Sequence, residues 1–127
     1  MEKLVVIVED DEHMRFLLEQ AIRGEGFRVD TASDGEIGLQ KIQTLLPDLV
    51  LLDLMLPRYG GYDILHRLQD GKTAGIPIIV VTGRPIDRAT EETIRQEPNL
   101  ADILVKPVKL PLLKAAIQKA LKRRPSS

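Results

Sequence analysis

Five short apolar runs recur along the chain, and between them apolar residues follow helical spacing. The apolar runs cover residues 4–8, 27–32, 49–52, 76–81 and 101–105. The segments with helical spacing cover residues 14–22, 37–46, 64–68, 86–94 and 110–121, and 86–94 has the weakest pattern. Strand-length runs that alternate with helical segments are typical of a parallel sheet with right-handed crossovers and helices on both faces. The pattern therefore predicts an α/β fold with a doubly wound parallel sheet.

The apolar runs differ in a way that predicts where each strand lies in the sheet. Residues 4–8, 49–52 and 78–81 are apolar throughout. Such runs are typical of parallel strands that are buried on both faces. Residues 27–32 alternate between apolar and polar side chains, so we expect an edge strand there.

Polar residues mark the starts of two helices. Ser33 with Glu36 predicts a capping box at the start of the second helix. Asp10 or Asp11 can cap the first helix, because a carboxylate at that position accepts a hydrogen bond from a first-turn N–H.

The composition narrows the function classes. The 127 residues include 43% hydrophobic and 29% charged residues, which is typical of one globular domain. Without cysteine the chain has neither disulfides nor thiolate metal sites, and two Tyr, two Phe and no Trp support base stacking poorly. The net charge of -1 gives no overall attraction to nucleic acid or anionic membranes, and no apolar run approaches the roughly 20 residues of a membrane span. We expect a cytoplasmic protein with no direct nucleic-acid or membrane partner.

The candidate functional residues come directly after the apolar runs. In an open parallel sheet, ligands bind outside the carboxyl ends of the strands. The residues at those positions are Glu9, Asp10 and Asp11 after the first run, Asp53 after the third, Thr82 and Gly83 after the fourth, and Lys106 and Pro107 after the fifth. Carboxylate, hydroxyl, backbone N–H and amine groups at one rim suit phosphate chemistry.

Three of these acids would repel one another if folding brought them together, so they would need a cation nearby. Two like charges about 4 Å apart repel by about 4 kcal/mol at an effective dielectric near 20. Glu9, Asp10 and Asp53 offer oxygen ligands only, which suits Mg²⁺, and Lys106 supplies further positive charge. A carboxylate beside Mg²⁺ can attack a phosphoryl group, and Asp53 is the best candidate nucleophile.

Each of these residues also has a purely structural interpretation. Asp53 alone could be a loop cap, and residues 9–12 alone could be a solvated helix start with favourable dipole placement. Thr82 and Lys106 alone could be incidental. The joint placement of these residues at four strand ends favours the functional interpretation.

Four motifs resemble one family over residues 3–121. The motifs are VEDDE (8–12), PDLVLLDLMLPRYGGYDIL (47–65), VVTGR (80–84) and LVKP (104–107). They resemble the receiver domain of two-component response regulators, a family that includes the chemotaxis response regulator. The resemblance implies a flavodoxin-like fold with strand order 2-1-3-4-5 and five helices. It also implies a receiver domain at residues 1–121. The remaining residues, KRRPSS (122–127), resemble a frayed C-terminal tail or the stub of a linker.

The resemblance also implies a role for each site residue. Asp53 would accept a phosphoryl group from the phosphohistidine of a sensor kinase, with the Thr82 hydroxyl following the phosphoryl group and Lys106 pairing with it. From its place after the fourth run alone, the Gly83 N–H can also donate a hydrogen bond to the phosphoryl oxygens. Asp10, Asp53 and the Met55 carbonyl would bind Mg²⁺, with Glu9 helping through water. The bond before Pro107 would be cis.

Three positions depart from the family pattern. Ile103 stands where the family usually has an aromatic residue that switches together with the threonine, so the output would depend on Thr82 and the loop after it. Val108 replaces the common Phe after Lys-Pro. NLAD (99–102) replaces the typical Gly-Ala-Asp-Asp, and the weak periodicity of 84–98 predicts a short or irregular fourth helix.

The preferred function is a phosphorylation-dependent switch whose only catalysis is self-phosphorylation and slow self-dephosphorylation. Its expected partners are a sensor histidine kinase or phosphotransfer protein, a downstream effector or output domain, and a second copy bound through the fourth helix, fifth strand and fifth helix. The chain is either a stand-alone receiver or one cut from a larger regulator. One alternative is a docking or dimerisation module that never carries phosphate.

Two other classes fit the sequence less well. An aspartate-nucleophile phosphatase places its nucleophile after the first strand in an Asp-x-Asp arrangement, whereas Asp53 is followed by Leu54 and Met55. A flavin-binding protein of similar topology needs a hydroxyl- and glycine-rich phosphate loop after the first strand, where this chain has acids.

Overall fold

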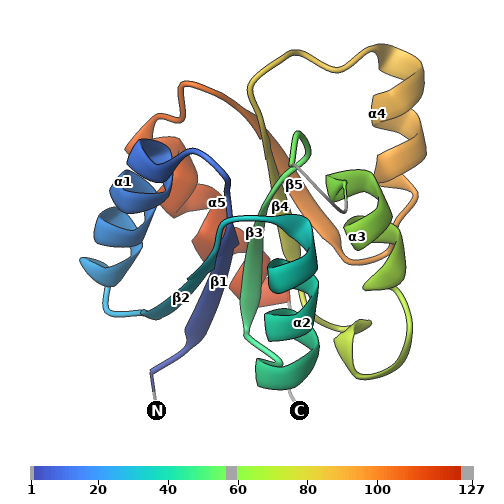
Figure 1. Cartoon of the computed structure of the whole chain (residues 1–127). Helices are drawn as coiled ribbons and strands as arrows, with labels where there is room; N and C mark the ends of the chain where they lie inside the picture. Colours follow the sequence, from blue (N-terminus) through green and yellow to red (C-terminus); the bar gives the residue numbers. More distant parts are fainter. Residues whose placement is uncertain (1, 57–59, 124–127) are drawn as a thin grey trace.

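A five-stranded parallel sheet lies between two layers of helices (Figure 1). The computed structural model describes residues 2–56 and 60–123. The strands are β1 (Leu4–Val8), β2 (Arg28–Ala32), β3 (Leu49–Asp53), β4 (Ile78–Thr82) and β5 (Leu100–Val105). Their order is β2-β1-β3-β4-β5 and every pair is parallel. The predicted fold class and strand order are confirmed.

The helices cover both faces of this sheet. They are α1 (Glu12–Arg23), α2 (Gly35–Leu45), α3 (Gly61–Arg67), α4 (Arg88–Arg95) and α5 (Leu110–Arg123), with a 3₁₀ turn, η1, at Gly71–Thr73. Helices α1 and α5 lie on one face, and α2, α3 and α4 lie on the other (Figure 1). Alternate residues of β1 therefore enter different cores: Val5 and Ile7 pack with α1 and α5, while Val6 and Val8 pack with α2 and α3.

The burial of the strands follows their sequence patterns. Every residue of β3 and β4 is buried, as their uniform apolar runs predict, and both strands are central. Strand β2 lies at an edge, as predicted, with only Val29 and Ala32 buried. Strand β5 forms the other edge, and its pairing with β4 is irregular between Ile78 and Ile79.

The helix starts confirm one prediction and correct another. Asp11 caps α1 by accepting a hydrogen bond from the Met14 N–H at 2.9 Å, as one of the two predicted caps. Asp34, not Ser33, caps α2, with its carboxylate 2.9 Å from the Ile37 nitrogen. Aspartate and serine are about equally good caps, so the sequence left the first turn uncertain by one residue.

Three further predictions concern the second half of the chain. Helix α4 has only eight residues, as the weak periodicity predicts. The Lys106–Pro107 bond is cis, as expected. Helix α5 runs to Arg123, so the first two residues of the predicted tail are helical, and residues 124–127 lie outside the described residues. Within the described ranges, no helix has the length and apolar character that crossing a membrane requires.

Candidate functional site

The register of the sheet brings the predicted site residues to one edge. Val8 pairs with Leu52 and Asp53 pairs with Val81, so Glu9 and Asp53 leave neighbouring strands at nearly the same level. On the other side, Thr82 ends β4, and the Lys106 N–H donates to the Thr82 carbonyl at 2.8 Å. Four separate segments therefore meet at the carboxyl edge of the sheet, where parallel α/β folds bind ligands.

Lys106 lies between two buried carboxylates. Its Nζ is 2.6 Å from Glu9 Oε1 and 3.3 Å from Asp53 Oδ2. Glu9 is 1% exposed and Asp53 is 4% exposed, whereas the neighbouring Asp10 is exposed. The second oxygen of each buried acid is held by backbone: Glu9 Oε2 accepts from the Asp11 N–H at 3.1 Å, and Asp53 Oδ1 accepts from the Met55 N–H at 2.9 Å. Both acids are thus fixed in orientation.

The contact between Lys106 and Glu9 leaves one polar atom poorly satisfied. Glu9 Oε1 is buried, and among the described side chains its contact with Lys106 is an ion pair whose geometry falls outside that of a hydrogen bond. Buried carboxylate oxygens ordinarily have such partners. The Lys106 amine at 2.6 Å offsets the charge of this oxygen, which still has a lone pair that a further ligand or water can use.

The buried position changes the pKa values of the pair. Burial raises the pKa of Glu9 to about 7, although the Lys106 side chain and the Asp11 N–H act in the opposite direction. Burial acts to lower the pKa of Lys106, but the carboxylates of Glu9 and Asp53 outweigh it and the net pKa is raised. The lysine therefore remains a cation.

The acids form a donor set that fits a hard divalent cation. Glu9, Asp10 and Asp53 each offer one carboxylate oxygen, and these three oxygens lie within 4.8 Å of one another. Oxygen-only ligands are typical of Mg²⁺ sites, in which one or two carboxylates bind the ion together with water. The poorly satisfied Glu9 oxygen and the one exposed carboxylate both suit an ion that reaches the site from solvent.

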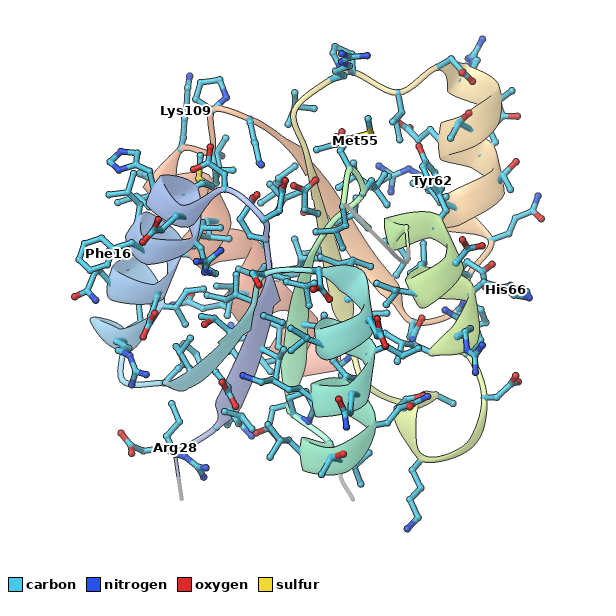
Figure 2. All side chains as sticks on the ribbon, viewed as in Figure 1. Phe16, Arg28, Met55, Tyr62, His66 and Lys109 are labelled. Atoms are coloured by element: carbon cyan, nitrogen blue, oxygen red, sulfur yellow. The ribbon has the colours of Figure 1, made fainter. Side chains whose placement is uncertain are left out.

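A shallow cleft of about 340 Å³ opens over this cluster. It is lined by Glu9, Asp10, Asp11, Asp53, Met55, Gly83, Arg84 and Lys106. Met55 is exposed and lies at the carboxyl edge of the sheet, which is the upper edge in Figure 2. The cleft therefore combines acids from two strands with amine and guanidinium groups.

Thr82 lies beside the cleft, and its hydroxyl is engaged elsewhere. The Oγ1 donates to the Arg84 carbonyl at 3.0 Å and accepts from the Arg84 N–H at 3.3 Å. Thr82 is 1% exposed and is not among the residues that line the cleft, whereas the next residue, Gly83, lines it. The hydroxyl must therefore release the β4–α4 loop before it can bond to a ligand in the cleft.

Ile103 lies away from the cleft, on the face covered by α2, α3 and α4. It is partly buried and packs against that core together with Leu56, Ile86 and Leu100. Ile86 belongs to the β4–α4 loop, the same loop that Thr82 holds through Arg84. An aliphatic side chain therefore occupies the position where the family resemblance predicts an aromatic switch residue.

Sequence reasoning missed Arg15. This half-buried residue of α1 donates from Nη1 to the carbonyl oxygens of Glu9 at 2.9 Å and Asp10 at 3.4 Å. An arginine one turn after the Asp11 cap was the available signal, because such a side chain can extend back over the helix start.

Comparisons with known proteins point to one family. The family model described as the response regulator receiver domain matches residues 5–118. The transcriptional regulatory protein AfsQ1 of Streptomyces coelicolor is 36% identical over 94% of this chain and 51% of its own length. The phosphate regulon regulatory protein PhoB of Rhizobium meliloti is also 36% identical, over 94% of this chain and 52% of its own. This chain thus spans about half the length of these relatives.

A solved structure gives the same result for the fold. The CheY-like receiver domain protein of Methanospirillum hungatei superimposes with a TM-score of 0.85 at 27% identity, over 98% of this chain and 97% of that one. The similarity extends through all five strands and helices, so it includes the carboxyl edge on which the cleft lies.

Proposed function

Because the chain belongs to the response regulator receiver domain family, we propose that it is a phosphorylation-dependent switch that accepts a phosphoryl group on Asp53. One observation carries the proposal: Glu9, Asp53 and Lys106 form a buried charged cluster, with the exposed Asp10 beside it. Strand ends that served packing alone would not gather two buried acids around one amine, because desolvated charges are costly.

In the proposed reaction, a carboxylate oxygen of Asp53 attacks the phosphorus of a phosphohistidine. The new O–P bond forms as the P–N bond breaks, and the leaving imidazole takes up a proton. With acetyl phosphate as donor, the P–O bond to acetate breaks instead. Later hydrolysis of the acyl phosphate by water returns the free carboxylate, so self-phosphorylation and slow self-dephosphorylation are the only catalysis in the proposal.

We propose that Mg²⁺ is bound by Asp10, Asp53 and the Met55 carbonyl, with Glu9 acting through water. When bound, the ion offsets the negative charge of the transferring phosphoryl oxygens. The all-oxygen donor set within 4.8 Å supports this assignment.

The remaining residues act on the phosphoryl oxygens. Lys106 already lies 3.3 Å from Asp53 Oδ2, so its amine is in place to pair with a group attached there. The backbone N–H of Gly83 and the hydroxyl of Thr82 are the proposed donors. Since that hydroxyl now bonds to the Arg84 carbonyl, its transfer to the phosphoryl group would release the β4–α4 loop. The loop carries Ile86, which packs against the same core cluster as Ile103, and this shared core is the proposed aliphatic route for the output.

The proposed partners follow from the reaction and from the relatives. A sensor histidine kinase or phosphotransfer protein supplies the phosphoryl group, and a downstream effector or output domain responds to it, which would place the switch in the cytoplasm. The relatives AfsQ1 and PhoB are transcriptional regulators about twice the length of this chain. A second copy bound through α4, β5 and α5 is the proposed dimer.

The experiment that tests the proposal is incubation with acetyl phosphate and Mg²⁺, followed by intact mass measurement. The wild type should gain the mass of one phosphoryl group, stable in acid and labile in base, while Asp53→Asn and a sample with EDTA should gain none. Absence of the gain in the wild type would contradict the proposal and favour the docking or dimerisation module that carries no phosphate.

A further inference from the structure

Arg15 ties helix α1 to the segment that carries two of the clustered acids. Its Nη1 donates to the Glu9 carbonyl at 2.9 Å and reaches the Asp10 carbonyl at 3.4 Å. These carbonyls belong to the first two residues after β1, where the strand pairing with β2 and β3 ends. One guanidinium thus holds the backbone carbonyls of two consecutive residues, Glu9 and Asp10, whose side chains belong to the acid cluster.

Two other hydrogen bonds hold this segment, and neither involves the carbonyl oxygens that Arg15 contacts. The Glu9 N–H donates to the Ala32 carbonyl at 3.0 Å, and the Asp11 N–H donates to Glu9 Oε2 at 3.1 Å. Both bonds act through N–H groups. Among the described residues, the hydrogen bonds to the carbonyls of Glu9 and Asp10 come from Arg15 alone. Without them, the Glu9–Asp10 peptide group could rotate, whereas the Asp10–Asp11 group would still be held through the Asp11 N–H. The Asp10 carboxylate would then lose its fixed separation from that of Glu9.

We infer that Arg15 is a positioning residue for divalent cation binding by Glu9 and Asp10. This inference rests on the proposed function, because it concerns the same cluster. Arg15 is itself a cation and would not bind the ion; it would act through the backbone of Asp10, the proposed ligand, and of Glu9, which acts through water. Residues that orient metal ligands from outside the coordination sphere typically change metal affinity by about 10- to 100-fold.

The chemistry of arginine suits this task better than that of lysine. A guanidinium is planar and presents several N–H donors in a fixed fork, whereas an ammonium is a compact charge on a flexible stem. Arg15→Lys should therefore retain the charge and part of the tie but lose its geometry. The Mg²⁺ dissociation constant of Arg15→Lys should therefore lie between those of the wild type and Arg15→Ala.

Helix α1 also provides a matched control. Arg23, in the last turn of the same helix, donates from Nη2 to the Val29 carbonyl at 2.9 Å and from Nε to Glu19 at 2.9 Å. Arg23→Ala therefore removes an arginine that bonds to a strand carbonyl at the opposite end of the helix from the cleft. It should lower stability and leave the acids in place.

The test is a Mg²⁺ titration of the full chain by calorimetry and by ¹H–¹⁵N NMR, for the wild type, Arg15→Ala, Arg15→Lys and Arg23→Ala. We expect Arg15→Ala to raise the Mg²⁺ dissociation constant about tenfold. Arg15→Lys should raise it less, and Arg23→Ala should leave it within about twofold of the wild type. The amide signals of residues 9–11 should shift in Arg15→Ala before any Mg²⁺ is added, and those in Arg23→Ala should not.

Two results would overturn the inference and are distinguishable. If the wild type binds Mg²⁺ and both Arg15 variants bind it equally well, Arg15 does not position the site, while the proposed function stands. If the wild type binds no Mg²⁺, the proposed function fails and this inference fails with it. Should Arg15→Ala not fold, the comparison of Arg15→Lys with the wild type decides, because that variant keeps the charge and most of the side-chain volume.

Discussion

Two polar regions lie at opposite ends of the sheet and are built differently. At the amino edge, the buried Asn99 side chain donates to the carbonyls of Leu68 at 3.2 Å and Thr73 at 3.5 Å, and its oxygen accepts from Gln69. This network is neutral and satisfied. At the carboxyl edge, the cleft brings buried Glu9 and Asp53 to one amine and leaves a Glu9 oxygen poorly satisfied.

The difference separates polar groups that stabilise the fold from those that are held for chemistry. The Asn99 network joins the segment between α3 and β4 to the start of β5, and every bond in it is made within the protein. The carboxyl edge holds charged groups that would be more stable in water. The raised pKa of Glu9, which burial causes, shows this cost. Substitutions at the two edges should therefore have different consequences.

The largest loss of stability is expected from a substitution at Gly61, because this glycine packs directly against the backbone of Asp53 and Leu54. A Cβ added at Gly61 would lie 2.5 Å from the Asp53 carbonyl oxygen and 2.5 Å from the Leu54 Cα. Gly61→Ala must push the backbone at the end of β3 away and should cost about 3 kcal/mol in the free energy of unfolding. Urea denaturation would measure the loss, and phosphorylation by acetyl phosphate should slow as well.

Gly75→Ala is the control for that substitution. Nothing lies within 4 Å of a Cβ added at Gly75. This variant should be as stable as the wild type or slightly more stable, because alanine restricts the unfolded chain. Equal stability of the Gly61 and Gly75 variants would show that the contact of α3 with the Asp53 backbone is loose.

A smaller effect, confined to stability, is expected at the amino edge. Asn99→Ala leaves the carbonyls of Leu68 and Thr73 without their amide donor and should cost about 2 kcal/mol. Mg²⁺ affinity should be unchanged, since Asn99 lies at the opposite end of the sheet. Gln118→Ala, at an exposed amide on α5, is the matched control and should be nearly neutral in the same denaturation experiment. A loss of Mg²⁺ affinity in Asn99→Ala would contradict the separation of the two edges.

The smallest effect is expected at an ion pair on the surface of edge strand β2. The Lys41 side chain, 2.9 Å from Asp30 Oδ1, lowers the pKa of Asp30. The stabilisation is present above the unfolded pKa and is lost as the pH falls through the lower folded value. Because the Asp30 side chain is 40% exposed, Asp30→Asn should cost about 0.5 kcal/mol at pH 7. The difference from the wild type should vanish in strong acid, as denaturation at several pH values would show.

The sequence predicted the fold well because its strongest signals are local. Uniform apolar runs such as 49–52 are typical of strands buried on both faces, and the alternating residues 27–32 suit an edge. The cap of α2 was misplaced by one residue because Ser33 and Asp34 are equally suitable. The placement of candidate site residues at strand ends needed only the order of runs and turns.

The parts that the sequence could not predict depend on side-chain geometry across the fold. Glu9 is buried and Asp10 is exposed, although the two acids are adjacent and chemically alike. Asn99 and Gln69 are 30 residues apart, and no charge or periodicity links them. The bonds of Arg15 to two carbonyls were also hidden, because the sequence shows a helix surface position and not the direction of its side chain.

The pH dependence of stability with and without Mg²⁺ tests the central claim most directly, with Glu9→Gln as the comparison because its amide cannot titrate. The pKa of Glu9 is raised from 4.5 to about 7 on folding, so the native state binds its proton more tightly than the unfolded chain. Without Mg²⁺, the free energy of unfolding of the wild type should therefore fall as the pH rises from about 5 to 8, relative to Glu9→Gln. Saturating Mg²⁺ should reverse that fall in the wild type and act weakly on the variant. Identical pH profiles for the two proteins, or a wild type that Mg²⁺ does not stabilise at pH 8, would contradict the claim that these acids are gathered for a cation.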